Sequence, residues 1–228
     1  MAYSLALRVQ GAGGVLASAA VQASEQIIES IRTEFPAFRI VEKQGDRLSH
    51  TLDWLLKILT LGGQRQYLTH YHTVLGFTLY VPSAWQAASD VERAIVLRHE
   101  RVHLRQRRRY GMALFAFLYL VPLLPLGLAW GRARLEWEAY SETLRATAEL
   151  CGLAAVGAPE LRRKIVGRFT GGAYGWMWPF EAQVQRWYDR VLGEIEAGSA
   201  GLVGQSGRRP AAANETVGLS DRARCRKS

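Results

Sequence analysis

The sequence His-Glu-Arg-Val-His at residues 99–103 constrains the fold of this 228-residue chain more than any other feature. On an α-helix, His99 and His103 lie one turn apart on the same face, so both imidazoles can reach one zinc ion. Glu100 would lie beside them, close enough to take a proton from a water at the metal without being a ligand itself. The motif therefore predicts a helix that carries two metal ligands and a general base.

The residues around the motif also favour a helix. Ser89 and Glu92 form a capping-box pattern, which predicts a helix start at about Asp90. Neither Pro nor Gly occurs in residues 85–110. The histidine face is continued at helical spacing by Val91, Ile95, His99, Val102 and Gln106. A core helix whose two histidines are simply hydrogen-bonded would show the same pattern, and this alternative stays open.

A zinc site that performs chemistry needs a third protein ligand and one open position. No histidine follows His103 in the sequence, so a carboxylate has to complete the site. Candidate carboxylates lie in residues 134–142, within a helix predicted from about Ala129 to Leu150. The sequence thus predicts a second helix that faces the first across the metal.

The HExxH motif, followed by Glu-Trp-Glu-Ala-Tyr at residues 136–140, resembles the gluzincin zinc peptidases, including the small minigluzincins and the membrane-embedded members. The resemblance covers residues 75–150. It implies an α+β, mostly helical fold, in which a zincin-like core places a short sheet beside the HExxH helix. It also implies that Glu136 is the third zinc ligand and that Tyr140, where the family more often has Asp, supports a zinc histidine.

Glu138 is the alternative third ligand. Residues two positions apart on a helix are separated by about two hundred degrees around its axis. Glu136 and Glu138 therefore cannot both face one zinc ion. Leu135 and Ala139 give Glu136 an apolar border suited to packing against another helix. Glu138 has Arg134 one turn away, which is typical of a solvated face with an ordinary ion pair.

The resemblance implies a zinc-dependent hydrolase, and most simply a peptidase that cleaves peptides or proteins with water activated by Glu100. The competing interpretation is a non-catalytic interaction module that zinc stabilises and that contacts a membrane through residues 111–130. The net charge of +9 favours acidic partners. Nucleic acid is nevertheless not expected, because part of this charge belongs to the C-terminal tail.

Strands are expected before the motif. Residues 38–43 are a strand candidate, and residues 67–81, rich in Thr, Tyr, Val and Phe, predict a strand or hairpin. In gluzincins a sheet edge pairs with the extended substrate, and Phe77–Val81 is the candidate edge. His70 and His72 alternate along this segment. Because no third ligand lies nearby, they are interpreted as surface or sheet-face residues.

Residues 111–130 contain no charged side chain and have the length of a membrane span. However, Pro122 and Pro125 interrupt the middle, and the segment joins two helices that must both reach one metal ion. The sequence therefore favours a bent hairpin that is either buried in the protein or inserted into one leaflet. Hydropathy alone does not separate these two possibilities.

Residues 1–197 are expected to form one zincin-like domain. Its further helices are predicted at about residues 20–35, 48–61, 160–169 and 181–197. Residues 198–228 are rich in Gly, Ala, Ser and Arg and predict a disordered basic tail. Two cysteines and an N-terminus without a basic segment beside an apolar core favour a cytoplasmic location, with membrane association as the variant.

Overall fold

The computed structural model describes residues 23–43, 72–120, 129–171 and 177–206. They form an α+β structure dominated by helices, as predicted. In chain order the elements are α2 (Ala23–Glu34), β1 (Arg39–Glu42), β2 (Thr73–Leu75), β3 (Thr78–Val81), the 3-10 helix η2 (Ser83–Trp85), α5 (Asp90–Tyr110), α6 (Met112–Leu120), α7 (Trp130–Cys151), α8 (Leu153–Gly157), α9 (Pro159–Thr170) and α10 (Glu181–Ser206).

The strands form one sheet in the order β1-β3-β2. β3 pairs in parallel with β1, where Arg39 lies opposite Thr78, and antiparallel with β2, where Leu75 lies opposite Thr78. Gly76, at φ +63°, makes the tight turn between β2 and β3. The prediction that Phe77–Val81 forms a sheet edge is wrong, because β1 comes from much earlier in the chain and pairs with the second side of β3.

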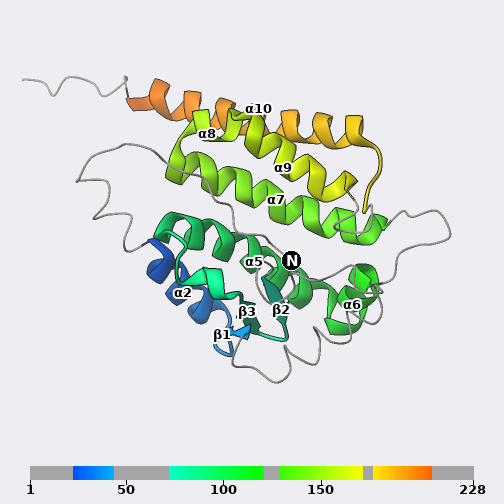
Figure 1. Ribbon diagram of the computed structural model, residues 1–228. Helices are drawn as coiled ribbons and strands as arrows, with labels where there is room; N and C mark the ends of the chain where they lie inside the picture. The colour runs from blue at the N-terminus through cyan, green and yellow to red at the C-terminus, as the bar shows by residue number, and fades with distance from the viewer. Residues whose placement is uncertain (1–22, 44–71, 121–128, 172–176, 207–228) are drawn as a thin grey trace, which may run out of the picture.

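Two layers meet along α5 and α7, which Figure 1 shows running side by side. In the first layer, α2 and the sheet pack against α5 around the buried side chains of Ile31, Leu79 and Leu97. In the second layer, α8, α9 and α10 pack against α7 around Leu144 and Phe169. Side chains that project from the facing sides of α5 and α7 are therefore buried between two apolar clusters.

The predicted helix around HExxH is confirmed as α5. Both halves of the capping box are present: Ser89 Oγ accepts from the backbone N–H of Glu92, and the Glu92 carboxylate accepts from the backbone N–H of Ser89. The helix ends at Gly111, whose φ of +76° turns the chain into α6. The second predicted helix is also confirmed, because α7 spans Trp130–Cys151.

Arg98 fixes the position of α5 against α7. Its guanidinium lies 2.6 Å from the Glu142 carboxylate and also bonds Glu149, both on α7. Two carboxylates two turns apart on α7 hold one planar guanidinium, which favours a single register between the helices. Because Arg98 directly precedes His99, this register sets where the first histidine meets α7.

Glu34, at the end of α2, joins that helix to α5. Its carboxylate pairs with Arg101, Arg105 and Arg108 at 2.7, 2.8 and 3.0 Å. The hydrogen bond from Arg105, with further help from Arg101, lowers the pKa of Glu34 to about 2 against the opposing effect of burial. One carboxylate thus neutralises part of the dense arginine cluster on α5.

Replacement of Glu34 by Gln should lower the free energy of unfolding near neutral pH, by on the order of 1 kcal/mol, because the arginines are partly solvated. The pKa is lowered in the folded state, so the stabilisation is complete above about 4.5 and is lost as the pH falls toward about 2. Urea denaturation of both proteins at several pH values measures the difference in their free energies of unfolding. A wild type–variant difference that persists undiminished below about pH 3 would contradict it.

Two helices depart from the prediction. The short α8 was not predicted, and α10 continues past the expected end at Ala197 to Ser206. The first turn of α9 begins at Pro159, as expected of a residue that has no N–H to donate. The helix predicted at 48–61 lies outside the described residues, as do most of the tail and the proline-containing part of the 111–130 segment.

Most of the described part of the apolar segment is α6, and one side of this helix is exposed. Met112, Leu114 and Phe117 expose about half of their surface, at 54%, 47% and 54%. A hairpin buried within the protein is therefore the wrong interpretation for these residues. Among the described residues, no helix has both the length and the hydropathy to cross a membrane.

Candidate metal centre

Three buried side chains converge between α5 and α7. Nε2 of His99 lies 3.7 Å from Oε2 of Glu136, and Nε2 of His103 lies 3.8 Å from Oε1 of the same carboxylate. One donor atom from each of the three side chains lies within 4.8 Å of the other two. The structure thus brings together the three residues that the sequence predicts as metal ligands.

Burial decides the charge of the first histidine. Removal from water lowers the pKa of His99 well below its ordinary value; the nearby His103 acts in the same direction, and Glu136 opposes both. The two rings lie 5.0 Å apart at an angle of 78°. A neutral imidazole retains the lone pair that a metal ion requires.

Thr143 orients His99 from behind. Its Oγ1 lies 3.0 Å from Nδ1 of His99, and the same hydroxyl donates to the carbonyl oxygen of Ala139 at 3.2 Å. With that hydroxyl proton committed, Oγ1 accepts the Nδ1–H of His99, which leaves the lone pair on Nε2 for a metal. The ring of Tyr140, which was predicted to support a histidine, lies edge-on to that of His99 at 4.9 Å.

Gln106 orients the ring of His103 in the same way. Its Oε1 lies 2.9 Å from Nδ1 of His103. Its Nε2 donates to the carbonyl oxygen of Leu135 and to Oε2 of Glu138, both at 2.9 Å. Because the amide nitrogen is held by two acceptors, its oxygen must face the imidazole, so Nδ1 carries the proton and Nε2 has the lone pair.

The sequence-based analysis missed Gln106 and Thr143, although both lie on the predicted faces. Gln106 is less than one turn beyond His103 on α5, and Thr143 is two turns beyond Glu136 on α7. Their helical spacing from His103 and Glu136 could have identified them as residues near the site. Residue type gave no further signal, because Gln and Thr occur at helix surfaces for many other reasons.

Glu136 and Glu138 point in different directions, as the helical geometry predicts. Glu136 is 1% exposed and faces both histidines. The side chain of Glu138 is 30% exposed and pairs with Arg134 at 3.5 Å. Glu138 therefore lies behind the site, where Gln106 links it to His103.

Glu100 is buried next to the first histidine, with 1% of its surface exposed. Within the described residues, its Oε1 is buried and has no hydrogen-bond partner, and the same holds for Nε2 of His99. A buried carboxylate oxygen without a hydrogen bond is costly in such a place. This oxygen therefore has acceptor capacity that a water or a substrate could use.

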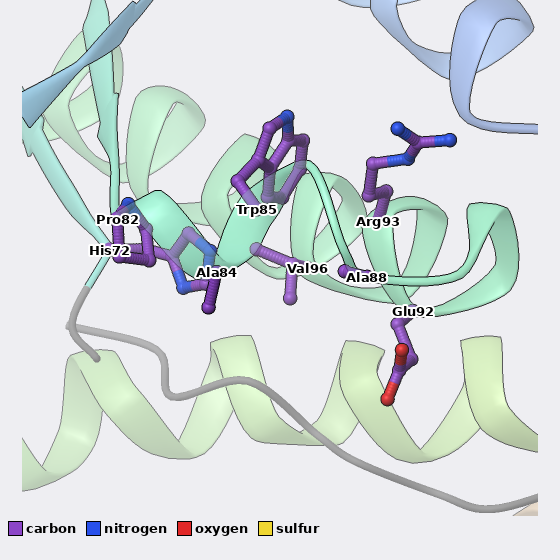
Figure 2. A pocket seen from close by; sticks show the side chains of 8 residues that line it. All are labelled: His72, Pro82, Ala84, Trp85, Ala88, Glu92, Arg93 and Val96. Atoms are coloured by element: carbon purple, nitrogen blue, oxygen red, sulfur yellow. The ribbon is translucent and has the colours of Figure 1, made fainter. Parts of the chain in front are cut away.

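His72 is buried rather than on the surface, so that part of its interpretation is wrong. Its ring lies edge-on to Trp85 at 5.4 Å, and only 2% of the residue is exposed. Figure 2 shows it in a small cavity with Val96 of α5. The cavity measures about 10 Å³, which is room for about one water molecule. His72 is not part of the metal-ligand group, and His70 lies outside the described residues.

One wall of the centre comes from α6. The ring of Phe115 lies 6.4 Å from that of His103 at an angle of 64°. An apolar side chain here limits the access of water to the second histidine from that direction. Tyr174, considered as a group that could stabilise a substrate oxyanion, lies outside the described residues.

The donor set fits a divalent metal ion. Each of the two imidazoles has its Nδ1 held by a neighbouring side chain and turns its Nε2 toward a shared carboxylate. Three protein ligands of this kind would leave a fourth position of a tetrahedral zinc site open. Two histidines and one glutamate are a donor set that binds zinc well. Comparisons of the chain with protein-family models, curated proteins and solved structures found no match.

Proposed function

We propose that this protein is a zinc-dependent hydrolase, and specifically a peptidase of the gluzincin type. The observation that carries the proposal is the buried group of His99, His103 and Glu136, with Glu100 beside it, on two facing helices. A purely structural pair of histidines would not need three donors turned toward one point with two further residues holding the rings.

Zinc would be held by Nε2 of His99, Nε2 of His103 and the carboxylate of Glu136. When bound, zinc acts as a Lewis acid that lowers the pKa of a water molecule and polarises a carbonyl group. The protein contributes a dry site between two apolar clusters, in which electrostatic interactions are stronger than in water.

Glu100 would act as the general base and then as the general acid. Its carboxylate takes a proton from the attacking water as that water adds to the peptide carbonyl. The protonated carboxyl then gives the proton to the nitrogen of the leaving amine. The unused Oε1 of Glu100 provides the acceptor for the first of these transfers.

The substrate would bind as an extended chain along β2. In the described sheet β2 forms one edge, and it contacts α5. Pairing with a strand edge uses main-chain hydrogen bonds, so it accepts many sequences and requires an unfolded or extended segment. β2 thus replaces Phe77–Val81 as the segment proposed for substrate binding.

The experiment that tests this function is removal and return of the metal. The purified protein should cleave an unfolded protein such as casein, lose that activity after treatment with a chelator, and regain it with added zinc. Circular dichroism before and after chelation separates loss of catalysis from unfolding. Hydrolysis that survives complete removal of the metal would contradict the proposal.

A further inference from the structure

The outer side of α6 and the first residue of α7 expose four large apolar side chains. Met112, Leu114 and Phe117 belong to α6, and Trp130, 53% exposed, begins α7. Single exposed apolar side chains are common on soluble proteins, but several large ones on adjoining turns mark a contact surface. We call these four residues the α6 face.

Contacts on the inner side fix the orientation of this face. Phe115 turns toward His103, and Leu118 packs on Gly131 of α7. A Cβ at Gly131 would lie 2.9 Å from the carbonyl oxygen of Leu118, so the two helices approach as closely as their backbones allow. Since these residues hold one side of α6 against the protein, Leu114 and Phe117 remain directed outward.

The chain around the α6 face is strongly basic. Residues 101–135 contain no acidic residue, and their arginines are Arg101, Arg105, Arg107, Arg108, Arg109, Arg132 and Arg134. Glu34 neutralises part of this charge from α2. Arg109, directly before the turn into α6, is exposed; the side chain of Arg134 is 57% exposed and pairs with Glu138 at 3.5 Å. An apolar surface with arginines on both flanks is complementary to anionic lipid headgroups above acyl chains.

We propose that the α6 face docks the protein on the surface of a membrane that contains anionic lipid. The nine residues of α6 are about 14 Å long, roughly half the thickness of a bilayer core, which suits a helix lying at the interface. The proposal goes beyond the peptidase function and does not depend on zinc. It also places lipid next to the metal centre, since Phe115 of the same helix lines it.

Cosedimentation of the full chain with vesicles tests this inference. Vesicles of phosphatidylcholine with phosphatidylglycerol should bind the protein, vesicles of phosphatidylcholine alone should bind it much less, and salt should weaken the binding. Leu114→Glu and Phe117→Glu should each reduce binding by about tenfold or more, because a carboxylate would enter the acyl region. Both sites are exposed, so the fold should survive.

Leu153→Glu is the matched control, because Leu153 is also exposed, at 41%, but belongs to α8 in the other layer. It should bind the vesicles like wild type. Equal binding of wild type, Leu114→Glu and Leu153→Glu would overturn the proposal. So would failure to bind either kind of vesicle. Sedimentation velocity without lipid gives one further outcome: a dimer that Leu114→Glu dissociates would assign the α6 face to a second copy of the chain instead.

Discussion

Replacement of Glu100 by Gln is expected to lower peptide hydrolysis by about a hundredfold or more while the metal stays bound. Gln has nearly the same shape as Glu and can still hydrogen-bond, but its amide cannot take a proton from water. Glu100 is no member of the donor group formed by His99, His103 and Glu136, so zinc affinity should change little. Steady-state kinetics and metal content of the same preparation measure the two quantities.

This variant also separates an enzyme from a non-catalytic module that zinc stabilises. If the wild type cleaves peptides and Glu100→Gln cleaves them equally fast, the proposed role of Glu100 is wrong. If the wild type binds zinc tightly but cleaves no unfolded substrate, the module becomes the better interpretation. A loss of zinc in Glu100→Gln would show that Glu100 holds the metal centre together rather than moving protons.

Replacement of Glu136 is the second change with a large expected effect, a loss of zinc affinity. Glu136→Gln keeps the shape of the side chain but offers a neutral amide oxygen in place of a carboxylate. Affinity should fall by more than about a hundredfold, which exceeds the ten- to hundredfold effects typical of residues that support a ligand from behind. Competition with a chromogenic chelator measures it.

Glu138→Gln is the matched control on the same helix. Glu138 is linked to His103 through Gln106, which Leu135 also holds in place. Zinc affinity should therefore fall by about tenfold at most. The opposite ranking, with a large loss in Glu138→Gln and a small one in Glu136→Gln, would move the third ligand to Glu138.

Local signals in the sequence predicted both helices that carry the site. Ser89 and Glu92 set the start of α5, because a capping box involves residues close together in the chain. Helix geometry also predicted that Glu136 and Glu138 point in different directions, whereas the choice of Glu136 as the ligand came from the family resemblance. Where a structural feature depends only on residues that are close together along one helix, the sequence was enough to predict it.

Non-local pairing was not predictable in this way. β3 has two neighbours in the sheet because β1, which lies much earlier in the chain, pairs with it. No pattern within Phe77–Val81 indicates this pairing. Gln106 meets Leu135 and Glu138 across the helix interface, so its role depends on the register of α5 against α7. Likewise, the hydropathy of α6 was evident, but whether it faced the core or solvent depends on how closely it meets α7 at Gly131.

The metal content of the purified chain tests the central claim most directly. Inductively coupled plasma mass spectrometry should find about one zinc per chain in the wild type. His103→Gln should retain the fold by circular dichroism and lose most of the zinc, whereas His72→Gln should retain zinc, because His72 lies outside the donor group. Equal zinc in the wild type and His103→Gln, or no zinc in a folded wild type supplied with the metal, would contradict the account.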